Sequence, residues 1–184
     1  METEFEVKFS PIKLNSFRKK LKSWGAKLVV PMRKMRRAIF DGKLHQQFKC
    51  DYIRIRDEGG KVRLSSKIHA KEGGQISDQK ETEVIIEDFE KTVEIFKAMG
   101  LEIDRYQETE REEWKYKNLS VVIDLWPWLE PAIEIEGESE EKVKQAAMDL
   151  GLDWDSRMIT SRVELYMKAY GFDEDETLHR MSSL

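Results

Sequence analysis

Three of the glutamate pairs that are separated by one residue could bring carboxylates together for cation binding. The three pairs are Glu4/Glu6, Glu81/Glu83 and Glu134/Glu136. In a β-strand, residues i and i+2 point to the same face with their side chains ~7 Å apart, so each pair would place two carboxylates side by side. Adjacent carboxylates repel each other, and their pKa values rise unless a cation lies beside them. Because hard divalent cations such as Mg²⁺ prefer oxygen ligands, the pairs indicate a cation site.

Basic side chains with even spacing occupy other segments that are predicted to be strands. These pairs are Arg54/Arg56, Arg63/Lys67 and Arg111/Lys115. Arginines bind phosphate oxygens through bidentate, charge-assisted hydrogen bonds. Asp124 adds a solitary carboxylate within the apolar stretch V-V-I-D-L-W. If carboxylate strands face guanidinium strands across a barrel, the interior forms a site for a metal–polyphosphate complex, and the apolar strand faces point outward beneath helices.

The hydrophobic periodicity predicts about eight strands and three or four helices in one α+β domain. Alternation predicts a strand pair over 26–40 and single strands over 4–9, 52–57, 61–68, 81–87, 110–117, 119–125 and 132–136. Helical spacing predicts helices over 12–24, 88–99, 139–150 and 158–170. We expect residues 1–172 to form this domain and residues 173–184 to form an acidic, loose tail.

The composition favours a cytoplasmic protein that does not enter a membrane. The 184 residues suit one domain, and 37% of them are charged. No window approaches 18 apolar residues, and the acidic, alternating start METEFEVKF is unlike a signal peptide. Cys50 is the single cysteine, which excludes an internal disulfide and fits a reducing compartment. The sequence leaves open whether the protein forms a homodimer.

Seven short motifs, taken in their order along the chain, resemble those of the CYTH superfamily, the triphosphate tunnel metalloenzymes. They are E-x-E-x-K at 4–8, Y-I-R-I-R-D at 52–57, L-S-S-K at 64–67, E-x-E at 81–83, E-R-E-E-W at 110–114, V-V-I-D at 121–124 and E-I-E-G at 134–137. The resemblance covers roughly residues 2–166. It implies an eight-stranded antiparallel β-barrel, open at both ends as a tunnel, with helices packed on its outside. It also implies a requirement for Mg²⁺ or Mn²⁺.

The resemblance further implies roles for individual residues. The metal-side carboxylates would be Glu4, Glu6, Asp124, Glu134 and Glu136. The phosphate-binding residues would be Lys8, Arg54, Arg56, Lys67 and Arg111. Glu81 and Glu83 would serve a second metal or balance the basic wall. We also expect one of the neighbours Arg36 and Arg37 to reach the tunnel, and we choose Arg37 as phosphate-binding. Glu4, Glu6 and Lys8 form the predicted catalytic set, in which either glutamate would orient or deprotonate the attacking water.

Three functions fit these residues. The first is metal-dependent hydrolysis of inorganic triphosphate or of a small organic or nucleoside triphosphate. The second is a class IV adenylyl cyclase, which makes cyclic AMP from ATP. The third is a non-catalytic module that binds polyphosphate or a nucleotide. Nucleic acid is a poor partner, because three E-x-E strands would repel its backbone. Departures from the family pattern at Thr109 and in the W-P-W-L-E-P stretch at 126–131 leave the substrate open.

Overall fold

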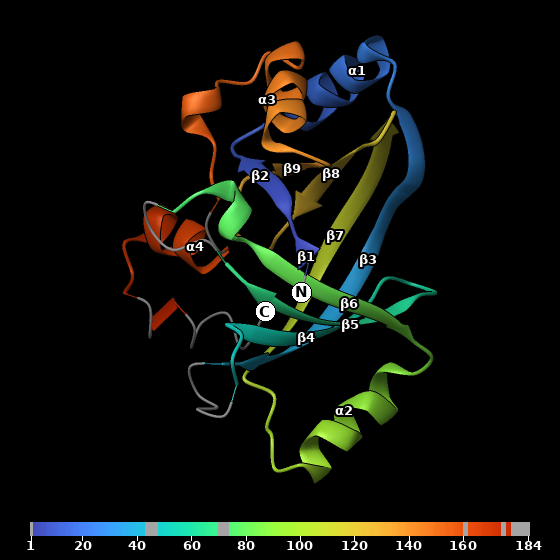
Figure 1. The fold of residues 1–184 in the computed structure, drawn as a ribbon, viewed down its shortest axis with the longest axis vertical. Helices are drawn as coiled ribbons and strands as arrows, with labels where there is room; N and C mark the ends of the chain where they lie inside the picture. The colour runs from blue at the N-terminus through green and yellow to red at the C-terminus, as the bar shows by residue number, and fades with distance from the viewer. Residues whose placement is uncertain (1, 43–47, 70–73, 160–161, 174–175, 178–184) are drawn as a thin grey trace.

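Nine antiparallel strands form one sheet in the computed structural model, which describes residues 2–42, 48–69, 74–159, 162–173 and 176–177. The strands of this described part are β1 (Glu2–Thr3), β2 (Phe5–Phe9), β3 (Lys27–Asp41), β4 (Tyr52–Asp57), β5 (Val62–Ile68), β6 (Lys80–Ile86), β7 (Arg105–Tyr116), β8 (Leu119–Leu125) and β9 (Ala132–Gly137). Their spatial order is β1-β6-β5-β4-β3-β7-β8-β9-β2 (Figure 1). The antiparallel sheet with helices confirms the predicted α+β class.

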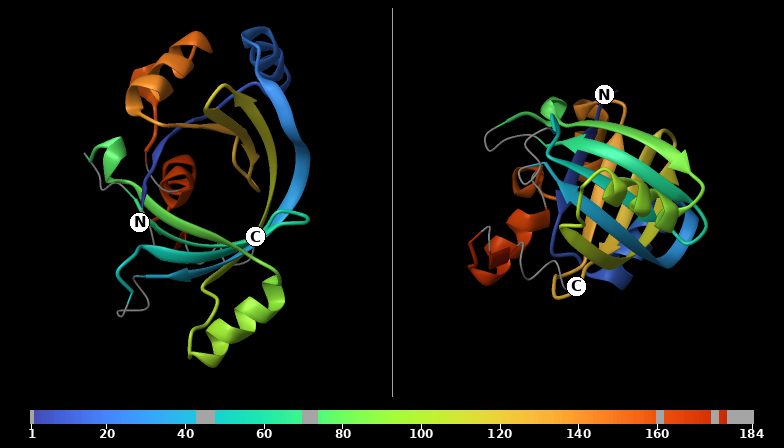
Figure 2. Two further views of the ribbon diagram at one scale, coloured as in Figure 1. Left: turned by 45° about the vertical axis from the view of Figure 1, so that its right-hand side comes forward. Right: turned by 90° about the horizontal axis from the view of Figure 1, so that it is seen from below.

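The two edges of this sheet are joined by the first residues of the chain. β1 pairs with β6 and β2 pairs with β9, yet only Glu4 separates β1 from β2. The main-chain N–H of Glu4 donates to the carbonyl of Gln79 at 3.0 Å, which continues the pairing with the β6 side. Residues 2–9 therefore close the sheet into a ring (Figure 2). Counted as one interrupted strand, β1 and β2 give the eight-stranded barrel that was predicted.

The helices lie outside the barrel wall. In the described residues they are α1 (Leu14–Trp24), α2 (Phe89–Ala98), α3 (Glu140–Asp149) and α4 (Arg162–Tyr170), with short 3₁₀ turns η1 (Ile76–Asp78) and η2 (Trp154–Ser156). α4 lies across one end of the barrel (Figure 2), and α1, α2 and α3 lie within the ranges 12–24, 88–99 and 139–150 where helices were expected. The side chains of Asp88 and Ser139 cap α2 and α3 by accepting from main-chain N–H groups in the first turn. Gly25 ends α1 in a left-handed conformation, with φ of 91°.

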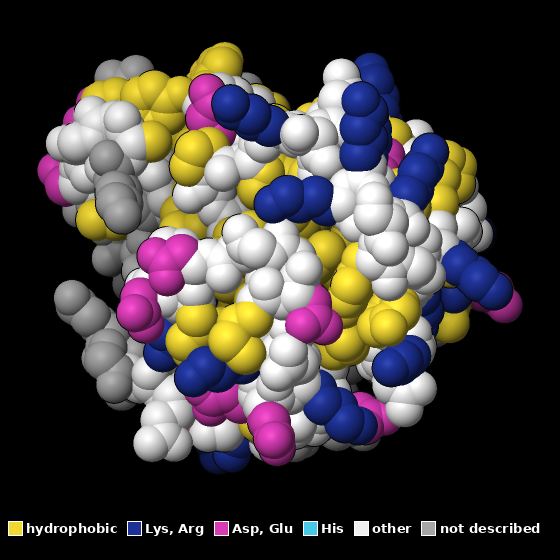
Figure 3. All heavy atoms as spheres, turned by 90° about the horizontal axis from the view of Figure 1, so that it is seen from above, with side chains coloured by type: hydrophobic (Ala, Val, Ile, Leu, Met, Phe, Trp, Pro, Cys, Tyr) yellow, Lys and Arg dark blue, Asp and Glu magenta, His cyan; other side chains and the backbone are white. Residues whose placement is uncertain are grey.

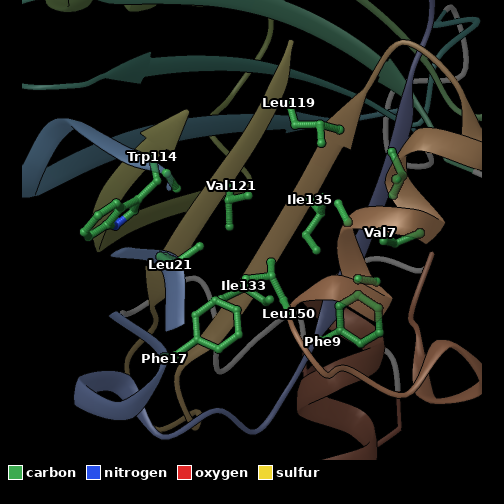
Figure 4. Close-up of a cluster of buried hydrophobic side chains, with 14 of the residues drawn as sticks. Val7, Phe9, Phe17, Leu21, Trp114, Leu119, Val121, Ile133, Ile135 and Leu150 are labelled. Atoms are coloured by element: carbon green, nitrogen blue, oxygen red, sulfur yellow. The ribbon is translucent and has the colours of Figure 1, made fainter. Parts of the chain in front are cut away.

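The apolar core lies between the barrel and its helices. One cluster joins Val7 and Ile135 on the outer face of the strands to Leu21 of α1 and Leu150 after α3 (Figure 4). A second cluster packs Ile55 and Phe40 against α2. The apolar strand faces therefore point outward, as predicted. Seen from the α1–α3 side, charged and apolar groups are interspersed over the surface (Figure 3). None of the described helices has the length and apolarity that crossing a bilayer requires.

Three element predictions were wrong in detail. The helix expected over 158–170 does not include Met158, which pairs with Lys8 in a β-bridge, and α4 is Arg162–Tyr170. The expected strand pair over 26–40 is one 15-residue strand, β3. Its pairing with β7 shifts register between Leu28 and Val30 and again between Val30 and Arg33. Pro31 has no N–H to donate, and this irregular stretch accommodates it without ending the strand. β7 begins at Arg105, five residues before the predicted start at 110.

The assignment of residues 1–172 to one domain stays a prediction, and so does the loose acidic tail over 173–184. Residues 174–175 and 178–184 of that tail lie outside the described residues.

Truncation of Leu21 tests the position of the core outside the barrel. Leu21 lies on the buried side of α1 and is fully buried. We expect Leu21→Ala to lower the free energy of unfolding by roughly 2–5 kcal/mol, because it leaves a cavity among packed side chains. Urea denaturation followed by circular dichroism measures the loss. Leu28→Ala is the matched control, since Leu28 is 47% exposed. Equal losses in the two variants would contradict the assigned core.

Candidate active site in the charged interior of the barrel

The strand register places the predicted site residues on a common inner face. Lys8 lies opposite Glu134, and Glu6 lies opposite Glu136, across the β2–β9 pair. The same cross-strand pairing joins Arg111 to Asp124 and Lys67 to Glu81. Directly opposed residues of an antiparallel pair share a face. The interior is therefore lined by side chains of both charges rather than by an apolar core.

Arg37, and not its neighbour Arg36, belongs to this inner face. Arg37 lies opposite both Arg56 and Gln107, and its Nε donates to the Gln107 side chain at 2.9 Å. Arg36 lies outside, where its guanidinium stacks over the ring of Phe89 in α2 at 4.5 Å.

Three carboxylates converge on the ammonium group of Lys67. Lys67 Nζ lies 2.6 Å from Glu4 Oε2, 3.5 Å from Glu6 Oε2 and 3.8 Å from Glu81 Oε2. Lys8 forms a further ion pair with Glu6. Lys67 and Lys8 are 4% and 5% exposed, so these contacts are buried. Carboxylate oxygens therefore surround a cation, the ammonium group of Lys67, at the seam that closes the barrel.

Arginines form the opposite part of the lining. Arg54 Nη2 lies 2.8 Å from Glu81 and Arg56 Nη2 lies 3.7 Å from Glu83. Arg111 donates to both oxygens of Asp124, at 2.7 Å each. A third hydrogen bond from Arg111 reaches Glu134 at 2.9 Å.

The two members of the first glutamate pair have opposite protonation states. Burial, reinforced by Glu6, raises the pKa of Glu4 to about 9. Burial also acts on Glu6, but the ammonium groups of Lys67 and Lys8 outweigh it and hold the pKa of Glu6 well below its usual range. Burial, together with Arg54 and Arg111, lowers the pKa of Arg56 to about 10. At neutral pH the ligand-free site therefore holds a proton on Glu4 beside an ionised Glu6.

The predicted metal carboxylates are divided between different cations. Glu4 and Glu6 surround the lysines, Asp124 and Glu134 bind Arg111, and Glu136 is exposed. Among the described residues, no group of three or more His, Cys, Asp or Glu side chains is arranged to hold a metal ion. The donors are nevertheless all carboxylate oxygens, the ligands that a hard divalent cation selects. Their chemistry fits Mg²⁺ or Mn²⁺ if the cation replaces the side chains that now neutralise them.

α4 lies across one end of the barrel (Figure 2), and aromatic side chains connect it to the loop after β8. The guanidinium of Arg37 lies 4.0 Å from the centre of the Trp126 ring. Tyr166 of α4 packs edge-on against Trp126, with ring centres 6.5 Å apart, and its hydroxyl donates to the carbonyl of Pro127 at 2.5 Å. These contacts orient Arg37 and fix the loop that follows β8.

Two charged residues of the interior were missed at the level of sequence. Glu58 is buried, although it belongs to a Glu-Gly-Gly turn that predicts solvent exposure. Arg33 lies opposite Arg111 across the β3–β7 pair and contacts Glu58. Local spacing did not predict either residue. For Arg33, the expected strand pair over 26–40 did not define which face of the sheet its side chain would be on.

Comparison with known proteins relates the whole arrangement to one family. Residues 2–165 match the family model of the CYTH domain. A conserved hypothetical protein from Pyrococcus furiosus is 26% identical with a TM-score of 0.73, covering 89% of this chain and 99% of that chain. A candidate adenylate cyclase from Vibrio parahaemolyticus is 16% identical with a TM-score of 0.74, covering 89% and 97%. A candidate adenylyl cyclase from Hippeastrum, for which a dominant triphosphatase activity is described, is 16% identical with a TM-score of 0.54, covering 95% and 99%. A comparison with curated proteins gives no match.

The raised pKa of Glu4 predicts how stability depends on pH. A carboxyl group whose pKa is raised from 4.5 to about 9 on folding contributes stability that is fully present below pH 4.5 and is lost as the pH rises toward 9. Glu4→Gln stays neutral throughout. We therefore expect the melting temperature of Glu4→Gln, relative to the unmodified protein, to increase steadily from about pH 5 to about pH 9.

Scanning calorimetry across this pH range measures the difference. Glu138→Gln is the control, because Glu138 is exposed and Lys142 and Asn118 lower its pKa. The control should show no gain at high pH. A pH-independent difference for Glu4→Gln would show that Glu4 is ionised in the folded protein.

Proposed function

The chain belongs to the CYTH domain family, and from this premise we propose that it binds a triphosphate together with a divalent metal inside the barrel and hydrolyses the triphosphate. The family includes triphosphatases and cyclases and is generally dependent on divalent metals. The observation that supports hydrolysis here is that buried carboxylates and buried arginines line the same barrel interior. The substrate class is inorganic triphosphate or a small organic or nucleoside triphosphate.

Binding would proceed by exchange of partners, because the inner cations are already paired. Phosphate oxygens would replace carboxylates on Arg54, Arg56 and Arg111, and a divalent cation would replace side-chain cations on the carboxylates. A triphosphate alone would leave carboxylates unpaired, and a metal alone would leave guanidinium groups unpaired. Unpaired buried charge is strongly unfavourable. The two ligands should therefore bind more tightly together than separately, which accounts for a dependence on metal.

The residues have distinct roles in this proposal. Glu4, Glu6, Asp124, Glu134 and Glu136 would hold the metal, with Glu81 and Glu83 balancing the basic wall or serving a second metal. Lys8, Arg37, Arg54, Arg56, Lys67 and Arg111 would hold the phosphates. A bound divalent cation would supply Lewis-acid stabilisation of charge on the phosphoryl oxygens.

The first glutamate pair would prepare the attacking water. Glu6 is ionised, so its carboxylate can accept a hydrogen bond from water and orient it. Glu4 is protonated in the ligand-free site and would lose that proton on binding the metal, after which its carboxylate could serve the same purpose. Lys8 pairs with Glu6 and would keep it in position. Phosphoryl transfer needs little beyond positioning and electrostatic stabilisation, so this set would position the water while the metal and the basic residues stabilise the charge.

Two other outcomes follow from the same site. A class IV adenylyl cyclase would use the same cradle with the ribose 3′-hydroxyl of ATP in place of water. A binding module would hold the triphosphate without turnover. Incubation with inorganic triphosphate, thiamine triphosphate and ATP, with and without Mg²⁺ or Mn²⁺, separates the three. Phosphate release supports hydrolysis, cyclic AMP detected by chromatography supports the cyclase, and binding without either product supports the module.

Removal of the last carboxylate pair tests the metal assignment. We expect Glu134→Gln combined with Glu136→Gln to lower metal-dependent turnover by roughly two to three orders of magnitude, because charge on the transferring phosphoryl group loses its neutralising cation. The fold should persist, since glutamine keeps the size of the side chain and can still accept from Arg111. Steady-state phosphate release measures the change. Glu141→Gln on the exposed face of α3 is the control. Normal turnover in the double variant would remove both glutamates from the metal site.

A further inference from the structure

One buried carboxylate in the barrel is held by three arginines. Glu58 is 7% exposed. Its Oε1 lies 2.7 Å from Arg56 Nη2, and its Oε2 lies 3.1 Å from Arg63 Nε and 3.4 Å from Arg33 Nη2. Arg33 Nε also donates to the main-chain carbonyl of Glu58 at 2.7 Å. We refer to Arg33, Arg56 and Arg63 as the arginine triad. Guanidinium groups in such a cluster form an anion-binding site, and here a side chain of the protein occupies it.

Glu58 reaches the triad from a turn and not from a strand. It follows β4 and begins the turn to β5, where its N–H donates to the carbonyl of Lys61 at 2.9 Å. Gly59 and Gly60 complete the turn with φ of 75° and 135°. Both values suit glycine, and nothing lies within 4 Å of a Cβ built at Gly60. The carboxylate is therefore carried by a residue at the start of a glycine turn and not by a residue in the middle of a strand, so its displacement from the triad does not require a change in strand pairing.

The arginine triad can donate hydrogen bonds to more oxygen atoms than Glu58 provides. Arg33 Nη1 and Arg56 Nε are buried donors that have no hydrogen-bond acceptor within the described part of the chain.

Two further carboxylates share the triad. Glu83 forms an ion pair with Arg63, and Glu113 lies 2.5 Å from Arg33. The side chains of Arg63, Glu83 and Glu113 are 27%, 27% and 26% exposed, so solvent reaches this part of the interior. The Glu58 side chain, at 6%, is the deeply buried carboxylate of the group.

We propose that the arginine triad is a further phosphoryl subsite, that the Glu58 carboxylate occupies it in the ligand-free protein, and that a phosphate chain displaces Glu58 when it binds. Arg56 follows Arg54 by two residues on the inner face of β4, so it would be shared between the central site and this subsite, while Arg33 and Arg63 extend the subsite beyond the central phosphates. The terminal phosphoryl group of a phosphate chain offers three acceptor oxygens and more charge than a carboxylate. The favoured ligand is therefore a linear inorganic polyphosphate longer than triphosphate. This rests on the proposed function only in taking the ligand to be a phosphate chain.

Calorimetric binding without metal tests the subsite directly. Inorganic tripolyphosphate and tetrapolyphosphate are titrated in EDTA into the unmodified protein, Glu58→Gln and the control Glu90→Gln. Glu90 also pairs with an arginine, since it lies 2.7 Å from Arg36 on the outer face. We expect Glu58→Gln to lower the dissociation constant of tetrapolyphosphate roughly tenfold, because the ligand no longer competes with a charged side chain for the triad. The gain should be smaller for tripolyphosphate, and the control should show none.

Three outcomes of this titration would overturn the proposal. An unchanged or weaker affinity in Glu58→Gln would make Glu58 a structural anchor of the turn. An equal gain for both phosphate chains would show only a change in net charge. A gain of the same size in Glu90→Gln would remove any link to the barrel interior.

Arg63→Gln gives a second test that does not depend on the folding of Glu58→Gln. Arg63 is partly exposed, and its loss should weaken tetrapolyphosphate binding roughly tenfold while affecting tripolyphosphate less. Unchanged tetrapolyphosphate binding would overturn the subsite. Phosphate release is measured in parallel with metal present. If tetrapolyphosphate binds as expected but no phosphate is released, the proposed hydrolysis is contradicted and the subsite stands. If phosphate is released but neither Glu58→Gln nor Arg63→Gln changes the dissociation constant, the subsite is contradicted and the hydrolysis stands.

Discussion

The pairing of buried cations with buried carboxylates across neighbouring strands is the interaction on which this barrel depends. Removing a charge from water is strongly unfavourable unless an opposite charge and hydrogen bonds compensate it. Lys67 among Glu4, Glu6 and Glu81, and Arg111 on Asp124, meet this requirement without any ligand. The interior is therefore a neutralised set of ions and not a preformed cavity of one sign. Any anion or cation that enters must replace existing partners, which is why the site favours ligands that bring both charges together.

An ionic interior is possible because the apolar core lies elsewhere. The outer strand faces pack against α1 and α3 on one side and against α2 on another, so the stability that other domains draw from a central core comes from the periphery. The closure at Glu4 is part of the same arrangement. The chain changes partner strand there, from β6 to β9, and the side chain of this seam residue contacts Lys67. The residues that close the barrel thus also belong to the candidate site, and strand pairing with β6 on one side and with β9 on the other holds them in position.

Much of the fold could be predicted from local patterns. The helices expected over 12–24, 88–99 and 139–150 are confirmed, and contacts within a few residues of Gly25, Asp88 and Ser139 fix their ends. β3 was harder, because Pro31 normally ends a central strand and the register shifts that accommodate it depend on β7. Part of the ionic lining escaped prediction for a similar reason. Glu58 is drawn inward by three arginines from β3, β4 and β5, and no spacing within its own turn reveals them.

By itself the sequence determined which residues share a strand face, because side chains alternate with a period of two wherever a strand forms. That was enough to group the glutamate pairs with Lys8, Arg54 and Arg111 and to direct the apolar residues away from them. The tertiary structure alone decided which faces meet and which charges become partners. Strand order, register and closure are set by contacts between residues far apart in the chain. They alone place Glu4 and Glu6 on Lys67, divide the acidic residues among several cations, and turn Glu58 into the barrel.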